Sequence, residues 1–215
     1  MTLQERLDKI KVKIESSLPQ ETVAIMHQGN ADLEATGISN NVLKVGDLAP
    51  TFNLKNQNDE LVSSKELLKS GSIVLTFYRG VWCPYCNTDI ANLNQYTDEM
   101  NGLNATMLGI SPQLPIYNQK IISQEHLNFD LLTDNHNSIA EAFGLRWEMK
   151  GALKSVYKDK FKINLADYNG DDSWTLPVPV RFIIGADGLI KYAEHSVDYT
   201  KRPDPTQLIH ALKNK

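Results

Sequence analysis

Three short apolar runs, each followed by a segment with helical spacing, constrain most strongly what this chain can fold into. The first run, SIVLTFY at residues 72–78, is nearly continuous and has the length of a strand buried on both faces. The runs TMLGIS at 106–111 and FDLLT at 129–133 have the same character. Helical stretches, such as 116–126 and 138–145, come between and after these runs. This alternation predicts an α/β layer fold with parallel strands.

The C-terminal third predicts an antiparallel addition to that sheet. The stretches VRFII at 180–184 and LIKYAEH at 189–195 flank Gly-Ala-Asp-Gly, which is a strong hairpin signal. The stretch PTQLIHALK at 205–213 predicts a closing helix. Residues 146–176 carry no sustained periodicity, and we predict them to be largely irregular, apart from a helical turn around Ser155–Tyr157.

The N-terminal residues 1–44 predict a helical extension that precedes a main domain at 45–213. The first predicted helix carries an apolar stripe made of Leu3, Leu7, Ile10 and Ile14. A second helix is expected at about 21–35. The stripe either packs on its own domain or forms the seam of a homodimer.

Charge and hydropathy argue against several classes of partner. The chain has 22 basic and 26 acidic residues and no block of basic residues, which argues against nucleic acid or an anionic membrane as a partner. No apolar stretch reaches the roughly 20 residues that span a bilayer, and the N-terminus lacks the apolar region of a signal peptide. We therefore expect a cytoplasmic protein, in which thiols are kept reduced.

The two cysteines of the chain stand at the junction between the first apolar run and the following helix, in the sequence Cys83-Pro84-Tyr85-Cys86. A dithiol at this place is the arrangement of the thioredoxin fold. The helix start favours a thiolate at Cys83, Pro84 suits the first helical turn, and Arg79 adds positive charge. Cys86 follows by about one turn and can reach Cys83. We predict Cys83 to be the more acidic and the more exposed of the two.

Three other uses of a cysteine pair fit less well. A structural zinc site needs four ligands, and the five histidines show no paired spacing that would complete one. A covalent haem site would need histidine at position 87, where Asn87 stands. A structural disulfide would close a very short loop and gain little. We predict redox chemistry with no metal or other cofactor, and keep metal binding and inert thiols as alternatives.

Four further residues are candidates for supporting roles. Trp82 and Tyr85 either frame a substrate groove or pack locally, and their position beside the dithiol favours the groove. Pro179 precedes the predicted strand at 180–184, and in a thioredoxin-like fold the loop before this strand faces the dithiol and carries a cis proline. Pro179 is either that cis proline or an ordinary strand-edge proline. Arg181 either approaches the site or lies on the surface, and the alternation of strand residues favours the surface.

Several motifs carry a family resemblance. They include VGDLAPTFNL at 45–54, VLTFYRGVWCPYCNTDIANLN at 74–94 and RFIIGADGLIKY at 181–192. In these stretches the chain resembles the peroxiredoxin superfamily, in the alkyl hydroperoxide reductase / thiol-specific antioxidant (AhpC/TSA) branch.

Four shorter motifs resemble a bacterial peroxiredoxin-like subfamily with a Cys-Pro-Tyr-Cys centre. They lie at Tyr78–Cys86, Ile110–Gln113, Tyr168–Trp174 and Asp198–Thr200. Together with the longer stretches, these motifs extend the resemblance over nearly the whole chain.

The resemblance implies a thioredoxin-like fold in which Cys83 is the peroxidatic cysteine and Cys86 the resolving cysteine. It implies a hydroperoxide substrate and a thioredoxin-like or glutaredoxin-like reductant, or glutathione. One position departs from the family pattern, because Gly80 stands where typical peroxiredoxins have Thr or Ser. Cys-Pro-Tyr-Cys is also the glutaredoxin sequence. Thiol–disulfide exchange without peroxidase activity and a redox-sensing binding module are therefore kept as alternatives.

Overall fold

The three apolar runs form neighbouring parallel strands at the centre of the main sheet: β3 (Ser72–Phe77), β4 (Ala105–Ser111) and β5 (Asp130–Thr133). Within residues 1–214, which the computed structural model describes, this sheet has seven strands in the order β2-β1-β5-β4-β3-β8-β9. The antiparallel strands are β1 (Asn53–Asn56), β2 (Leu61–Ser63), β8 (Val180–Ile184) and β9 (Ile190–His195). The predicted α/β class, with a mixed central sheet flanked by helices, is confirmed.

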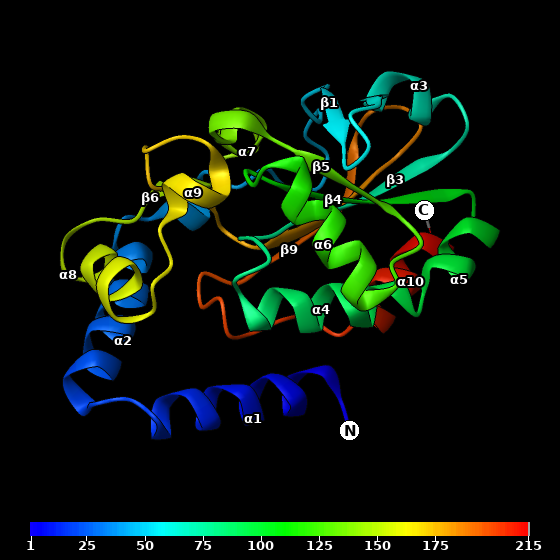
Figure 1. Ribbon diagram of the computed structural model, residues 1–215. Coiled ribbons are helices and arrows are strands. Elements are labelled where there is room, and N and C mark those ends of the chain that lie inside the picture. Colours follow the sequence, from blue (N-terminus) through cyan, green and yellow to red (C-terminus); the bar gives the residue numbers. More distant parts are fainter. Residues whose placement is uncertain (215) are drawn as a thin grey trace.

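Helices cover both faces of this sheet (Figure 1). One face carries α1 (Leu3–Ser16), α4 (Pro84–Asn94), α5 (Thr97–Gly102), α6 (Pro115–Glu125) and α10 (Pro205–Lys213). The other face is covered by α3 (Ser64–Leu68), α7 (Ser138–Ala142) and the segment that includes the 3-10 turn Ile38–Asn40. Because both faces are covered, every residue of β3 is buried. None of the helices within residues 1–214 is both long and apolar enough to cross a membrane.

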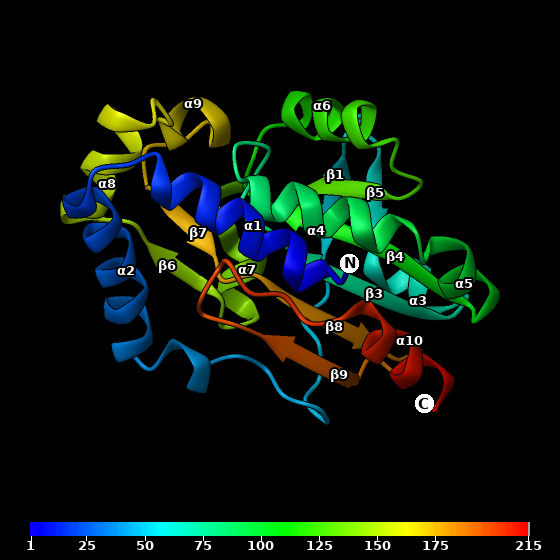
Figure 2. The ribbon, with the colours of Figure 1, turned by 90° about the horizontal axis from the view of Figure 1, so that it is seen from below.

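The N-terminal helices α1 and α2 (Gln20–Ala35) pack on the rest of the chain. Figure 2 shows α1 lying along α4. Leu3 and Leu7 are buried in the same core as α4, and the two later residues of the stripe are partly buried against it. The apolar stripe therefore packs within its own chain, and a homodimer would have to use another surface.

The prediction that residues 146–176 are largely irregular is wrong. They contain β6 (Arg146–Glu148), α8 (Gly151–Ser155), a π-helical turn (Val156–Lys160), α9 (Leu165–Asn169) and β7 (Thr175–Pro177). Strands β6 and β7 pair antiparallel, and the segment has a small core of its own around Met149, Leu165 and Trp174. Each element has three to five residues, which is too short for a sequence periodicity to develop.

Candidate active site

Cys83 lies where β3 gives way to α4. It is the N-cap residue of α4 with an extended backbone (φ −99°, ψ 104°), and Pro84 occupies the first turn. The N-cap position adjoins the unpaired amide groups and the positive end of the helix dipole, both of which favour a thiolate. Cys83 and Cys86 are free thiols, and both are buried, with 2% and 1% of their surface exposed. Cys83 is the more exposed of the two, as predicted, but the difference is too small for exposure alone to distinguish the two sulfurs.

Arg79 supplies a buried positive charge beside the first cysteine. Its Nη2 donates a hydrogen bond to the hydroxyl of Tyr157 at 2.6 Å. The guanidinium carbon lies 4.8 Å from the ring centre of Trp82 and 4.2 Å from that of Tyr199. Aromatic faces attract a cation without supplying a full negative charge. The charge of Arg79 therefore remains available to a thiolate at Cys83.

These surroundings make Cys83 an acidic thiol. Burial opposes its ionisation, but a hydrogen bond from Cys86 and the charges of Arg79 and Arg202 outweigh that effect. Together they lower the pKa of Cys83 from 9.0 to about 6. At neutral pH the sulfur of Cys83 is therefore mainly a thiolate, which is the nucleophilic form of cysteine.

A cavity of about 280 Å³ opens onto Cys83. Both predicted groove residues, Trp82 and Tyr85, line this cavity, together with Pro84 and Arg79. The remaining wall comes from the N-terminal helices and the turn between them, from the segment after α8, and from the loop between β9 and α10. Its residues are Ile14, Ser17, Leu18, Met26, Tyr157, Phe161, Ile163 and Tyr199. The cavity therefore combines one reactive sulfur and one cation with a mainly apolar wall.

Cys86 lies one helical turn further on, away from the cavity and next to a buried ionic cluster. The Nη2 of Arg202 lies 3.4 Å from the Sγ of Cys86, and its Nε donates to Asp89 at 3.1 Å. Arg181 binds the other carboxylate oxygen of Asp89. Burial and the neighbouring Cys83 thiolate raise the pKa of Cys86 well above 9.0, although Arg202 and Arg79 act in the opposite direction.

Two of the predicted supporting residues differ from the sequence-based interpretation. Arg181 was expected on the surface, but it is 2% exposed because its strand β8 is buried on both faces and Asp89 binds its guanidinium. Pro179 is buried directly before β8, and no peptide bond within residues 1–214 is cis. The cis alternative for Pro179 is therefore wrong. Pro179 borders the ionic cluster and does not belong to the lining of the cavity beside Cys83.

The loop before Cys83 explains the glycine at position 80. Gly80 has φ +141°, in the region that favours glycine, and a Cβ there would lie 2.7 Å from Nε1 of Trp82 and 3.1 Å from Oε1 of Gln113. That amide oxygen accepts a hydrogen bond from the backbone N–H of Val81 at 2.8 Å, and its nitrogen donates to Tyr78. Gln113 therefore holds the loop in place, and no hydroxyl side chain fits at position 80.

Sequence reasoning did not find Asp89, Arg202 and Gln113. Asp89 could have been noticed, because a carboxylate three residues after Cys86 falls on the same buried face of the helix. Gln113 ends the Ile110–Gln113 motif, which carried a resemblance but no assigned role. Arg202 approaches from another element, and no local pattern marks it.

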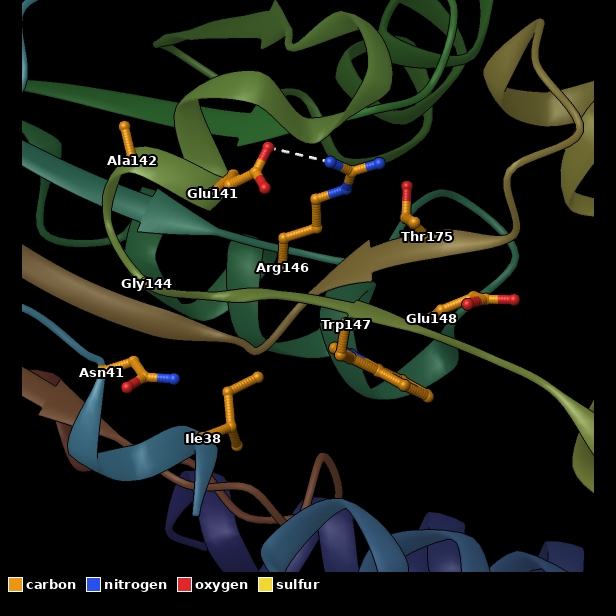
Figure 3. Close-up of a pocket in the computed structure, with 9 residues that line it drawn as sticks. All are labelled: Ile38, Asn41, Glu141, Ala142, Gly144, Arg146, Trp147, Glu148 and Thr175. Carbon is orange, nitrogen blue, oxygen red and sulfur yellow. Dashed lines mark hydrogen bonds and ion pairs between the residues drawn. The ribbon is translucent and has the colours of Figure 1, made fainter. Parts of the chain in front are cut away.

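A larger cavity of about 630 Å³ lies elsewhere, between β6, α7 and the turn at Ile38–Asn40 (Figure 3). Arg146, the cation in the lining of this cavity, is paired with Glu141 at 2.8 Å. Neither cysteine belongs to the lining. Within residues 1–214 no group of three or more His, Cys, Asp or Glu side chains is arranged to hold a metal. The chemistry of the chain is therefore concentrated at Cys83 and Cys86.

The sequence model of the AhpC/TSA family matches residues 45–193. The chain belongs to the AhpC/TSA family. A relative from Haemophilus influenzae, described as "Putative peroxiredoxin bcp", is 36% identical over 127 residues, which are 58% of this chain and 81% of the relative. "Peroxiredoxin Bcp" of Escherichia coli strain K12 is 29% identical over 152 residues, or 71% of this chain and 85% of the relative. These relatives support a peroxiredoxin-like thiol peroxidase.

Solved structures of AhpC/TSA-like proteins share the fold. The peroxidoxin BcpB of Mycobacterium tuberculosis has a TM-score of 0.62 at 20% identity, over 80% of this chain and 97% of that protein. A peroxiredoxin-like protein of Aquifex aeolicus has a TM-score of 0.61 at 18% identity, over 80% of this chain and 88% of that protein. The thioredoxin-like, peroxiredoxin-type fold predicted from the sequence is confirmed.

Proposed function

We propose that the protein is a thiol peroxidase in which Cys83 attacks the hydroperoxide and Cys86 resolves the product. The observation that carries this assignment is the difference between the two sulfurs. Cys83 has a pKa of about 6 and lines the cavity, whereas the pKa of Cys86 is raised and its sulfur faces Arg202. Because the thiolate is the nucleophile, Cys83 reacts first, and the oxygen that leaves the hydroperoxide takes its proton from water.

The reaction consists of two balanced steps. The Cys83 thiolate attacks one oxygen of the hydroperoxide, so that an S–O bond forms, the O–O bond breaks, and the other oxygen leaves with a proton as an alcohol or water. The sulfur of Cys83 is oxidised by two electrons to a sulfenic acid. The Cys86 thiolate then attacks that sulfur, so that the S–S bond forms and hydroxide leaves and becomes water. The two sulfurs supply both electrons, and neither step uses a metal or another cofactor.

Two unpartnered N–H groups beside Cys83 support the peroxide step. The Nε of Arg79 and the Nε1 of Trp82 are buried and have no hydrogen-bond partner among the described residues. A buried donor without a partner is costly, and the oxygens of a bound hydroperoxide would satisfy both groups. These donors would take the place of the hydroxyl that Gly80 lacks.

The apolar cavity supports a hydroperoxide with an apolar body as substrate. We propose that residues 1–44 act as an extension of the domain at 45–213 and shape this cavity, since Ile14, Leu18 and Met26 belong to its wall. Burial of an apolar substrate against these side chains contributes to binding roughly in proportion to the apolar area removed from water.

Reduction of the disulfide needs two electrons, which one dithiol or two molecules of a monothiol supply. We propose a thioredoxin-like or glutaredoxin-like protein, or glutathione, as the reductant, and the cytoplasm as the compartment. Exchange with such a thiol returns Cys83 and Cys86 to the reduced state.

The alternative is a thiol–disulfide oxidoreductase that uses the same two sulfurs. Two observations favour this alternative. The dithiol has the sequence Cys-Pro-Tyr-Cys, and Gly80 leaves no hydroxyl three residues before Cys83. A redox-sensing module would need no turnover at all.

Turnover of peroxide separates these functions. Catalytic amounts of the protein, supplied with excess dithiothreitol, should consume hydrogen peroxide and cumene hydroperoxide over many cycles. Reduced protein mixed rapidly with peroxide should show a change in tryptophan fluorescence, since Trp82 adjoins Cys83. Reduction of a model disulfide without peroxide consumption would favour the oxidoreductase, and an absence of both activities would favour the sensor.

A further inference from the structure

Arg202 is buried against the Cys86 sulfur, although its segment lies outside the part of the chain that the family model matches. Its Nη2 is 3.4 Å from the Sγ of Cys86. An arginine donates hydrogen bonds only, so this contact is strong when the sulfur is a thiolate and weak when it is a thiol. The contact therefore favours the ionised form of Cys86.

The guanidinium of Arg202 is held in this position from several sides. Its Nε donates to Asp89 at 3.1 Å, and its Nη1 donates to the carbonyl oxygens of Tyr199 and Lys201, both at 2.7 Å. Its backbone N–H donates to the side chain of Gln4 on α1 at 3.1 Å. The group that faces Cys86 is thus fixed before the sulfur ionises.

The charges around Arg202 are not balanced by Asp89 alone. That carboxylate is shared with Arg181, and the other acidic groups that act on Arg181 are Glu194 and Asp204. Asp89 is the carboxylate that acts on Arg202, and because Arg181 shares it, Asp89 does not fully neutralise the Arg202 guanidinium. A thiolate on Cys86 would neutralise it.

The Cys83 thiolate opposes ionisation of Cys86 before the reaction, while Arg202 and Arg79 favour it. The buried Tyr78 also interacts electrostatically with Cys86, and its hydroxyl is bonded to Asn118 and Gln113. Oxidation of Cys83 to a neutral sulfenic acid removes the opposing negative charge. The two arginines then act on Cys86 without opposition.

We propose that Arg202 is a catalytic residue of the second step, in which its guanidinium binds the Cys86 sulfur as a thiolate while that sulfur attacks the Cys83 sulfenic acid. The inference rests on the proposed peroxidase function. In this step the S–S bond forms, the S–O bond of the sulfenic acid breaks, and the proton that Cys86 lost ends on the leaving hydroxide as water. Arg202 thereby makes Cys86 reactive only after Cys83 has been oxidised.

The test follows both steps in a single turnover. Reduced protein is mixed with one equivalent of hydrogen peroxide at about pH 8, where Cys83 remains ionised even if its pKa rises slightly. Acid quenching and dimedone trapping then give the rates of sulfenic acid formation and of disulfide closure. In Arg202→Met we expect disulfide closure to slow about 10- to 100-fold, with sulfenic acid formation changed less than about threefold.

Three further variants complete the test. Lys201→Met removes an exposed charge from the neighbouring residue of the same segment and should leave both rates unchanged. Arg202→Lys keeps the positive charge but cannot contact Asp89 and Cys86 at the same time, so it should slow disulfide closure alone by an intermediate factor. If the Met variant does not fold, the Lys variant is used in its place. In a Cys83→Ser background, Arg202→Met should also raise the pKa of Cys86.

The outcomes separate the two proposals. Closure at the parental rate in Arg202→Met, or equal slowing of both steps, would overturn the role of Arg202. If the parent protein forms no sulfenic acid at all, the peroxidase function itself fails, whatever the variants do.

Discussion

Cys83 and Cys86 are three residues apart at the start of one helix, yet their surroundings are opposite in character. Cys83 is the N-cap of α4, lines an apolar cavity and faces Arg79, whose neighbours are aromatic rings. Cys86 lies inside the helix against Arg202 and a buried carboxylate. The start of the helix therefore fixes the order of the two sulfurs, whereas residues distant in the sequence decide when each of them is ionised.

The largest difference should appear when each sulfur is removed. Cys83→Ser should lower peroxide turnover by more than about 1000-fold, because Cys83 supplies the one thiol among the described residues that line the cavity. Cys86→Ser should still consume one equivalent of peroxide and stop as a sulfenic acid on Cys83, which dimedone labelling and mass spectrometry would locate. If Cys83→Ser instead reacts at the parental rate and carries the label on Cys86, the two roles are reversed.

Removal of the cation next to Cys83 should have the next largest effect. Arg79→Met should raise the pKa of Cys83 from about 6 toward 9.0. The reaction with peroxide near neutral pH should slow about tenfold, because less thiolate is present. Arg79→Lys, which keeps a charge, should lose less, and the deficit should narrow at alkaline pH. An unchanged rate for Arg79→Met at neutral pH would contradict this account of the low pKa.

Stability should depend on pH with opposite signs for the two thiols. The pKa of Cys83 is lowered by folding, so the unfolded chain binds one more proton between the folded value of about 6 and the ordinary value of 9.0. The free energy of unfolding of the reduced protein should rise with pH across this window, by up to about 1.4 kcal/mol per pH unit. The contribution is lost as pH falls through 6.

Urea unfolding of the reduced protein across this pH range measures the effect. Cys83→Ser should lack the rise and Cys86→Ser should keep it. The pKa of Cys86 is raised, so its contribution is present at lower pH and is lost only as pH rises above 9.0. If the rise disappears in Cys86→Ser and persists in Cys83→Ser, Cys86 is the acidic thiol and the assignment made here is wrong.

The smallest effect concerns the apolar wall on the side of Cys83. Ile14→Asp should raise KM for cumene hydroperoxide by about threefold to tenfold and leave hydrogen peroxide unaffected, because only the larger substrate contacts this wall. Val12→Asp is the matched control, since Val12 is on the same helix and 67% exposed. Equal changes for both peroxides, or in both variants, would show that α1 does not shape the substrate site.

The part of the site that lies on one continuous stretch could be predicted from the sequence. The apolar run before Cys83, the proline after it and the helical spacing beyond were sufficient to place the dithiol between β3 and α4. Local patterns record local structure, and here strand length, N-cap position and helix start all agree.

The rest of the site could not be read from local patterns. Arg202 reaches Cys86 from 116 residues further along the chain. Arg181 looked like a surface residue because alternation assumes one exposed face, whereas β8 is covered on both. The wall residues Tyr157 and Phe161 belong to a segment whose helices and strands are too short to show a period. Tertiary packing alone brings these residues together.

Cys83 is the acidic thiol, and Cys86 remains protonated at neutral pH. A titration of ultraviolet thiolate absorbance measures both ionisations directly. The reduced parent protein should ionise one thiol with a midpoint near 6 and the second well above 9.0. Cys86→Ser should retain a titration below about 7.5, and Cys83→Ser should have none in that range. Two thiols that titrate together near their ordinary values, or an acidic thiol that persists in Cys83→Ser, would contradict the account.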